Sequence, residues 1–336
     1  MEVESLPCKA LSYPALVGEL SKGQEVLLNS TAVDRKLGTG GYLFVVAPAV
    51  LPEPRTGPGH MMKARYTPLQ TMVLGVDEQE SPHHEVFQQH DSIDGMPVVV
   101  ADLHSALPAI VACARHVNPS IRIAYIHTDT AALPIAFSKA SARLTELDHI
   151  TTITSGQSYG GDYEAVNVHT ALITAKHVIG ADIAVVIQGP GNVGTGTPWG
   201  YSGTAVGESI NAINALGGTA IATLRVSQAD RRERHLGISH HSITSYTSVA
   251  LTPAIIPTVS ENIGTDVQEL IKAALPKLTS CEHLTLREVT GVDAGLRKSA
   301  VPLRTMGRDL EADYAAFAYA GAGGVLAAQL LHEPAK

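Results

Sequence analysis

The sequence predicts an α/β fold: a mostly parallel sheet with helices on both faces, preceded by a small β-rich N-terminal part. After residue 95, short apolar runs typical of buried strands alternate with segments of helical periodicity, and such alternation favours a parallel sheet. Before residue 90, the apolar runs are short and are separated by glycine and proline, which is typical of a barrel or meander. We therefore expect a small domain over residues 1–90 and a ligand-binding domain over residues 91–336.

The N-terminal part has strand-like runs at residues 25–28, 41–46 and 71–74, and its proline-rich residues 47–68 predict an extended connection. In the second part we expect strands at residues 97–101, 121–126, 149–154, 181–187 and 219–224, with weaker candidates near Val249 and Leu284. Helices are expected at residues 106–116, 133–144, 164–179, 202–216 and 314–331.

The terminal helix over residues 314–331 is apolar on nearly every face. Its alanine and glycine content favours a packing helix over a membrane span. A helix that packs on one sheet face alone would show a polar stripe, so this helix must be covered twice. The N-terminal β-rich part could supply the second cover within one chain. A two-fold interface is at least as compatible, and we expect a homo-oligomer with this helix at or near the subunit interface.

Composition narrows the function classes. The formal net charge of -8 and the 17% of charged residues argue against a nucleic-acid surface. Residues 1–5 lack the basic and apolar regions of a signal peptide, and the three cysteines are far apart, so neither a disulfide framework nor a thiolate zinc site is indicated. We expect a cytoplasmic protein without nucleic-acid or membrane partners.

A glycine-rich loop follows the strand at residues 181–187 and precedes the helix at residues 202–216. Backbone amides of glycines can approach an anion closely, and the helix start adds partial positive charge, so the loop suits a phosphate or a carboxylate. The expected ligand-binding residues of the loop are Gly189, Gly191, Asn192, Gly194, Thr195, Gly196, Thr197, Trp199 and Ser202.

The loop also satisfies the G-x-G-x-x-G pattern of dinucleotide-binding proteins, from Gly189 to Gly194. Gly196 and Pro198 delay the helix, however, and the next strand leads to Arg225 in place of an acidic residue, which would suit a 2′-phosphate. A dinucleotide site, another anion site and a purely structural loop all remain open, and no cofactor is assigned.

Polar residues follow the other predicted strands, and the carboxyl ends of parallel strands share one edge of a sheet, where ligands bind. Asp102 and His104 follow the first strand, and Asp129 follows the second. Asp102, Asp129 and Asp162 could each cap a helix instead. Three of the loops are much longer than a cap requires, and this favours a functional site.

We assign general acid-base chemistry to Asp162, Glu164 and His235, because paired titratable groups at a cleft can tune one another. Glu164 has an alternative role in the first turn of a helix, where an acid stabilises the helix dipole. Arg225, Arg232 and Arg234 add guanidinium groups that pair with phosphate or carboxylate, although a solvated loop is equally compatible.

Histidines are numerous, 15 in all, and several lie near carboxylates. Imidazole and carboxylate ligands of a metal site could come from Asp102 with His104, Asp129 with His127, and His240 with His241. Neither H-E-x-x-H nor H-x-H-x-D is present. His240 and His241 are adjacent and should project in different directions, so we expect at most one of them to be a ligand. Hydrogen-bonded or surface histidines are the alternative, and the metal remains unknown.

Eight segments of the chain carry long and specific sequence strings: residues 31–34, 37–42, 59–70, 76–82, 160–167, 196–203, 232–235 and 239–241. On these segments the chain resembles a bacterial family of unknown function, found in Gram-positive and actinobacterial genomes, over nearly its full length. The resemblance carries no established reaction, cofactor or catalytic residue.

The residues themselves favour an enzyme that acts on, or with, a small anionic or nucleotide-like ligand at the glycine-rich loop. The alternatives are an NADP-type oxidoreductase and a non-catalytic ligand sensor or assembly module.

Overall fold

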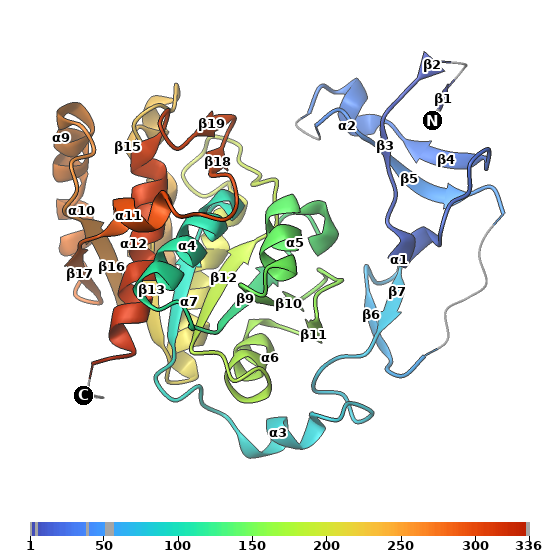
Figure 1. Cartoon of the computed structure of the whole chain (residues 1–336), viewed down its shortest axis with the longest axis horizontal. Coiled ribbons are helices and arrows are strands. Elements are labelled where there is room, and N and C mark those ends of the chain that lie inside the picture. The colour runs from blue at the N-terminus through green and yellow to red at the C-terminus, as the bar shows by residue number, and fades with distance from the viewer. Residues whose placement is uncertain (1, 4–5, 38–39, 51–56, 334–336) are drawn as a thin grey trace. The chain divides into compact units, whose positions relative to one another are not determined.

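The computed structural model describes residues 2–3, 6–37, 40–50 and 57–333 (Figure 1). It divides the chain into two compact units, Met1–Leu74 and Gly75–Lys336.

The first unit is built from short strands, as its short apolar runs predict. Among its described residues it has three small sheets, of which the largest has the order β3-β5-β4. The strands are β1 (Glu2–Val3), β2 (Leu6–Pro7), β3 (Ala10–Leu11), β4 (Val26–Asn29), β5 (Leu43–Pro48), β6 (Met61–Lys63) and β7 (Thr71–Val73). Two single-turn helices, α1 (Pro14–Val17) and α2 (Thr31–Asp34), complete the unit.

The second unit is built around a sheet of eight parallel strands within residues 75–333, which confirms the predicted α/β class. In spatial order the strands are β11 (Tyr163–Ala165), β10 (Thr151–Ser155), β9 (Ile123–Thr128), β12 (Ile183–Gln188), β8 (Pro97–Ala101), β13 (Thr219–Ala222), β16 (Ala254–Val259) and β17 (Leu284–Val289). The central strands β9, β12 and β8 are buried at every residue, as expected for strands covered on both faces.

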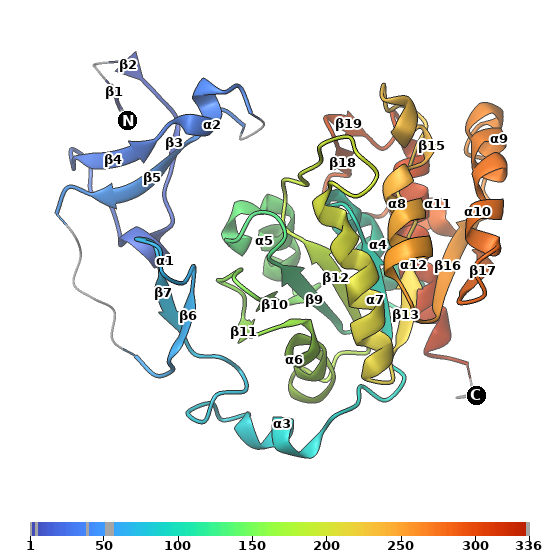
Figure 2. The same cartoon turned by 180° about the vertical axis from the view of Figure 1, so that it is seen from behind.

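Helices cover both faces of the sheet, and the reversal of the chain explains their distribution. From β8 the chain moves outward through β9 and β10 to β11, and it then returns to β12 and crosses to β13. Because βαβ crossovers are right-handed, helices of the outward path and of the return path lie on opposite faces. One face carries α4 (Leu107–Val117), α5 (Lys139–Glu146), α11 (Val292–Leu296) and α12 (Tyr314–Leu330), and the other carries α6 (Val168–Ile173), α7 (Ala205–Ala215) and α8 (His240–Thr244) (Figures 1 and 2).

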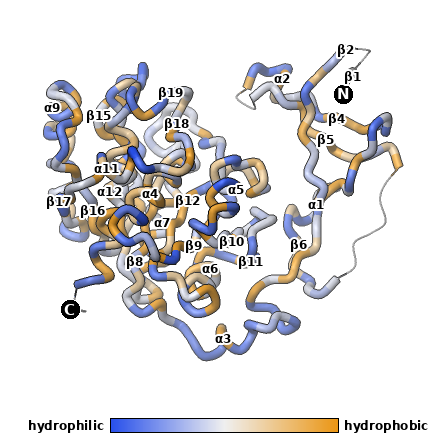
Figure 3. Tube along the Cα trace, in the orientation of Figure 1, coloured by the Kyte–Doolittle hydropathy of each residue, from blue (hydrophilic) through white to orange (hydrophobic). Residues whose placement is uncertain are grey.

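Smaller elements lie at the ends and the edge of this sheet. Helix α9 (Thr265–Ala274) lies beside β15 (Gly237–Ile238) and carries both hydrophilic and hydrophobic residues, whereas the central strand β12 is mostly hydrophobic (Figure 3). The remaining helices and hairpins are α3 (His84–Gln89), α9 (Thr265–Ala274), α10 (Pro276–Thr279), β14 (Val226–Ser227) with β15 (Gly237–Ile238), and β18 (Arg304–Thr305) with β19 (Arg308–Asp309).

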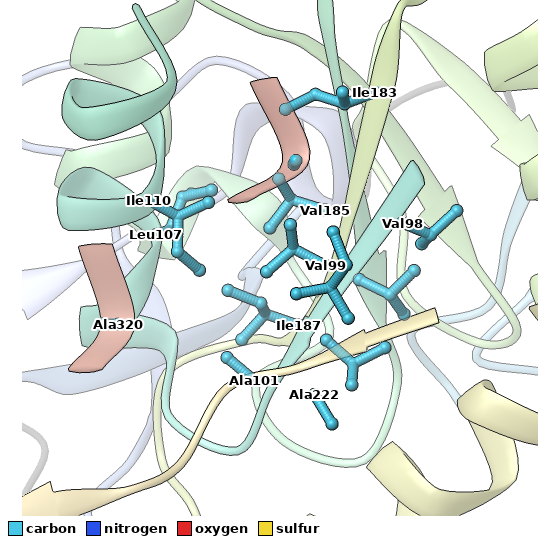
Figure 4. Packing of buried hydrophobic residues seen from close by; sticks show 14 of the residues in the cluster. Val98, Val99, Ala101, Leu107, Ile110, Ile183, Val185, Ile187, Ala222 and Ala320 are labelled. Carbon is cyan, nitrogen blue, oxygen red and sulfur yellow. The ribbon is translucent and has the colours of Figure 1, made fainter. Parts of the chain in front are cut away.

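The core fills both faces of the sheet, and one half of it lies between the central strands and the helices on the α4 face. Val99 of β8 pairs with Val185 of β12, and both side chains lie with Ile187 against Leu107 and Ile110 of α4 (Figure 4). All of these residues are at most 1% exposed. Burial of such branched side chains supplies the main driving force for folding, at about 25 cal/mol per Å² of apolar surface.

Helix α12 is enclosed by its own chain, and this removes the reason for expecting a subunit interface there. It packs against α4, α11 and the strands β8 and β16, and its residues from Phe317 to Ala328 are all buried. A methyl group on Gly324 would overlap the carbonyl oxygen of Ile110, so glycine allows α12 to lie directly on α4. The second cover that the apolar helix needs is therefore α4 together with α11.

Some predicted elements were wrong in position. The helix expected at residues 164–179 is preceded by β11, so Glu164 lies on a strand, and α6 begins only at Val168 before continuing as a π-helix, Thr174–Val178. The strand expected near Val249 is instead β16, because Ser245–Val249 forms a π-helical turn. The extended connection at residues 47–68 contains β6, and residues 51–56 of it lie outside the described residues.

Candidate functional site

The candidate site lies at the carboxyl ends of three neighbouring strands, β12, β8 and β13, near the centre of the sheet. The loop after β8 leads to the α4 face, whereas those after β12 and β13 lead to the other face. Diverging loops of this kind leave a crevice at the sheet edge, which is where ligands bind in open α/β sheets. The three loops contribute Asp102, the glycine loop (residues 189–203) and Arg225.

Asp102 is the centre of the site. Its Oδ2 accepts hydrogen bonds from Nη1 of Arg225 and from Nδ1 of His241, both at 2.9 Å. Its Oδ1 accepts one from Nδ2 of Asn192 at 2.5 Å. The side chains of Asp102, Arg225 and His241 are 3%, 10% and 8% exposed, so the ion pair is removed from water.

The neighbours of Asp102 favour its ionised form. Burial alone would raise the pKa of this carboxyl, but the hydrogen bond from His241 and the charge of Arg225 outweigh burial and lower the pKa below its ordinary value. Gly203 makes room for the carboxylate, because a methyl group at this position would overlap Oδ1 of Asp102.

His241 is held at Nδ1 by its charged neighbours and on one ring face by Tyr201. Nδ1 of His241 lies 2.9 Å from Oδ2 of Asp102 and 3.0 Å from Nη1 of Arg225. In the tautomer in which Nδ1 donates to the carboxylate, Nε2 of the neutral ring carries a free lone pair. The ring stacks on Tyr201 with centroids 3.7 Å apart, and the Tyr201 hydroxyl donates to the His241 carbonyl oxygen at 2.9 Å. A methyl group on Gly194 would lie 4.0 Å from Nε2 of His241, so this nitrogen faces the glycine loop.

His235 and His240 complete what we call the open histidine group, His235, His240 and His241. His235 lies in a 3-10 turn, Glu233–His235, and Ser239 caps α8, whose first two residues are His240 and His241. The three ring centroids lie 4.5–5.1 Å apart. Adjacent His240 and His241 thus lie in one cluster, and the expectation that they diverge was wrong because the helix start turns both rings toward His235.

Burial keeps two of these rings neutral. It lowers the pKa of His235 to about 3, with the charges of Arg225 and Arg232 as further causes. Burial also lowers the pKa of His240, followed by the charges of His241 and Arg234. Such shifts cluster at functional sites, where they set the protonation state that the chemistry requires.

Many polar groups of the glycine loop form hydrogen bonds with other residues of the same loop. The amide of Val193 donates to Oγ of Ser202, and that of Thr195 donates to the Gly200 carbonyl oxygen. The hydroxyls of Thr195 and Thr197 also bond within the loop. These hydrogen bonds stabilise the loop conformation. The backbone amides that make them are not available to a ligand, so fewer amides face a ligand than we expected.

The outer part of the loop is exposed and lies beside an arginine. Val193 and Trp199 are 63% and 61% exposed. A methyl group on Gly196 would lie 3.8 Å from the guanidinium of Arg234. Gly191, with φ of +99°, has open space around it. Gly189, in contrast, packs against His127 and the Ala132 carbonyl oxygen and belongs to the interior side of the loop.

Several residues expected in the site lie elsewhere with partners of their own. Asp162 accepts from the amide and hydroxyl of Thr152, and Glu164 accepts from the hydroxyl of Thr154 and the amide of Gly160. These bonds join β10 to the β11 segment. The structure therefore brings only His235 of the three expected catalytic residues to the open histidine group.

Other expected ligand residues also have structural partners. Asp129 accepts from the amide of Gln157, and Arg232 forms a two-pronged ion pair with Asp230. None of Asp102, Asp129 and Asp162 caps a helix among the described residues, so the capping alternative was wrong for all three.

His104 belongs to a second cluster, the closed histidine group, which is His104 and His127 with Tyr125 between them. The two ring nitrogens of His104 lie 3.1 Å from the Tyr125 hydroxyl and 2.6 Å from Oγ of Ser138. Those of His127 lie 3.3 Å from the Tyr125 hydroxyl and 2.7 Å from the Ala132 carbonyl oxygen. Burial is the main cause that lowers the pKa of His104 to about 3 and also lowers that of His127.

Three details of the site were not predicted: the hydrogen bond between Asp102 and His241, the Tyr201 stack, and the convergence of both His240 and His241 on His235. Ser239-His-His241 did carry a signal, since Ser before a helix is a capping pattern. Arg225 was expected to face a ligand phosphate, but its ion pair with Asp102 uses Nη1. The dinucleotide interpretation rests on the glycine fingerprint and on Arg225, and one guanidinium nitrogen of this arginine is used within the protein. A cavity of about 30 Å³ beside Asp102, Arg225 and Thr305 has room for a water only.

Comparison with known proteins gives a family. Among the described residues, no helix combines the length and the apolar character needed to cross a membrane. No curated protein matches this sequence. Residues 9–324 match the family described as "Protein of unknown function (DUF3866)", and the chain belongs to this family.

Proposed function

We propose that this protein is an enzyme that acts on a small anionic, nucleotide-like ligand at the glycine loop, with the open histidine group as its reactive end. One observation carries the proposal. Nε2 of His241 faces the glycine loop at Gly194, while Nδ1 of the same ring is fixed by the buried carboxylate of Asp102. A carboxylate that orients an imidazole toward a loop is a common arrangement of a reactive histidine.

The energetic cost of the site supports a function over a purely structural role. Asp102 and Arg225 are charged and nearly enclosed, and the desolvation of such a pair can exceed its mutual attraction. Apolar residues would fill the same space without this cost. Placing the pair beside three histidines at the carboxyl edge of the sheet is therefore better explained by chemistry at that edge.

The outer loop supports an anionic ligand that carries a ring. Arg234 is exposed beside Gly196 and can pair with a phosphate or a carboxylate. Trp199 offers an exposed indole on the same loop, onto which a base can stack. Arg232 cannot serve in this way while it pairs with Asp230, so Arg234 is the arginine that we assign to the ligand.

Trp199 provides the test, because it is the single tryptophan of the chain. We expect its fluorescence to change on titration with inorganic phosphate, AMP or ATP, with correction for nucleotide absorbance. Arg234→Gln should weaken binding by about tenfold, since one charge-assisted hydrogen bond contributes about 1.5 kcal/mol. The matched control is Arg231→Gln, an exposed arginine of the same segment that should leave binding unchanged. Equal affinity of wild type and Arg234→Gln would contradict the proposed ligand site.

Turnover distinguishes an enzyme from a sensor. Phosphorus NMR of each bound nucleotide or phosphate ester, after incubation with the protein, reports whether the ligand is recovered unchanged. We expect conversion of at least one of them, and Asp102→Asn should lower its rate roughly 10- to 100-fold through the loss of His241 orientation. Ligand binding with no conversion across such a panel would favour the sensor.

A further inference from the structure

We infer that the open histidine group, His235, His240 and His241, is a binding site for one divalent transition metal ion, with zinc as the expected metal. One ring nitrogen from each of the three histidines lies within 4.8 Å of the others. Three imidazoles from two short adjoining segments converge without any acidic residue among them. Imidazole nitrogens are ligands for zinc and its neighbours, whereas magnesium and calcium prefer oxygen.

The first argument is the orientation of His241. Its Nδ1 lies 2.9 Å from Oδ2 of Asp102 and 3.0 Å from Nη1 of Arg225. When Nδ1 donates to the carboxylate, Nε2 carries the free lone pair. Histidines that bind zinc usually donate their other ring nitrogen to a carboxylate in this manner, and the carboxylate fixes the ring and makes it a better ligand. Asp102 thus occupies the position of the carboxylate that supports a metal-binding histidine.

The second argument is the orientation of His235. Its Nδ1 lies 2.7 Å from Oγ of Ser239, which also accepts the amide hydrogen of His241. A hydroxyl oxygen has two acceptor lone pairs, so it can accept from both groups at once. In that tautomer Nε2 of His235 is free, as it is in His241.

The third argument is the unpaired nitrogen of His240. Its Nε2 is buried and has no hydrogen-bond partner among the described residues. Buried polar atoms in folded proteins nearly always have a partner, and an unpaired one in a cluster of like groups calls for an explanation. A metal ion shared with His235 and His241 supplies the missing partner.

The geometry requires only a small adjustment. Zinc–imidazole bonds of about 2.0–2.1 Å place nitrogens about 3.4 Å apart in a tetrahedral site, so each ring would move by under about 1 Å. Three protein ligands leave the fourth position for water or for a ligand atom, which is the arrangement of catalytic zinc sites. The glycine loop lies beside His241 at Gly194, and three neutral imidazoles leave the charge of the ion available to attract an anion there.

This inference deepens the proposed function, because it gives the histidine group its reactive species, but its test does not need the ligand. The full chain, made without a polyhistidine tag, would be stripped with EDTA and titrated with Zn²⁺ against a chromogenic chelator. Metal content would be measured by mass spectrometry, and Co²⁺ would report tetrahedral coordination by its visible absorption. We expect about one ion per chain, with retained zinc in protein purified without chelator.

Variants assign the site to these residues. His240→Ala and His235→Ala should lower the Zn²⁺ affinity by at least about 100-fold, and Asp102→Asn by roughly 10- to 100-fold. The matched control is His169→Ala, which removes an exposed histidine of α6 and should bind zinc as the wild type does. Circular dichroism would check that each variant folds.

Binding of far less than one ion by the wild type, or equal binding by folded His240→Ala and the wild type, overturns the inference. If His240→Ala does not fold, Asp102→Asn and the wild-type stoichiometry decide. A wild type that binds zinc while Trp199 responds to no phosphate or nucleotide supports the metal site and contradicts the proposed ligand. A wild type whose Trp199 responds to phosphate or a nucleotide but which binds no zinc contradicts the metal site and leaves the proposed ligand site standing.

Discussion

The carboxyl edge of the central sheet carries two groups of enclosed histidines that use their ring nitrogens differently. In the closed group, every ring nitrogen of His104 and His127 has a hydrogen-bond partner from the protein. In the open group, Nδ1 of His235 and of His241 are fixed, but Nε2 of His241 faces the glycine loop and Nε2 of His240 has no partner.

Whether each ring nitrogen already has a hydrogen-bond partner distinguishes a structural histidine from a functional one. A nitrogen that already donates or accepts inside the protein stabilises the fold and has nothing left for a ligand. In other histidines, one ring nitrogen has a partner that orients the ring and the second nitrogen has none. This second nitrogen can bind a metal ion or a proton. Burial and lowered pKa do not separate the two groups, because burial lowers the pKa of both His104 and His235 to about 3.

The largest expected effect comes from removing Asp102, the carboxylate that orients His241 in the open histidine group. Asp102→Ala leaves Arg225 buried without its partner, and breaking one side of a buried pair destabilises proteins by about 3–5 kcal/mol. Urea unfolding should show a loss of this size. Glu146→Ala breaks an exposed pair with Arg143 and should change the free energy of unfolding by at most about 0.5 kcal/mol. If both variants lose the same small amount, Asp102 does not hold the open group together.

A smaller effect distinguishes the two groups directly. His104→Ala removes one buried hydrogen bond from Ser138 and one from Tyr125, so the free energy of unfolding should fall by about 2–3 kcal/mol. His240→Ala, measured in EDTA, removes a ring nitrogen that has no partner and should cost about 1 kcal/mol or less. Equal losses in the two variants would mean that the free nitrogen of His240 is not the difference between the groups.

Much of this architecture can be predicted from the sequence, and the reasons are local. Strands such as β8 and β12 are buried on both faces and therefore appear as unbroken apolar runs. Asp102 and Arg225 follow such strands closely, and parallel strands place their carboxyl ends on one edge, so their common location follows from strand order in the chain.

The pairing of side chains cannot be predicted in the same way. Asp102 and His241 are 139 residues apart, and only the order of β8 and β13 in the sheet brings them together. Glu164 was placed on a helix because the short strand β11 has too few residues to show a period. Once β11 pairs with β10, its partner becomes Thr154.

The smallest expected effect concerns pH and tests whether the closed group is fully enclosed. His104 faces Tyr125, Ser138 and the ring of His127, and burial lowers its pKa to about 3, whereas an unfolded histidine titrates near 6.5. Between these values the unfolded chain binds more protons than the folded one. The free energy of unfolding therefore falls as the pH is lowered through this window, and His104 contributes at most about 1.4 kcal/mol per pH unit.

The comparison of His104→Gln with the wild type isolates this contribution, because glutamine remains polar and does not titrate. Urea unfolding at pH 7, 6 and 5 should show a shallower pH dependence for His104→Gln than for the wild type. The exposed His169 has no such enclosure, so His169→Gln should follow the wild-type slope. Parallel curves for all three proteins would show that His104 takes up its proton in the folded state. A closed group that protonates so readily would have the same access to solvent as the open one, and the distinction between them would then rest on hydrogen bonding alone.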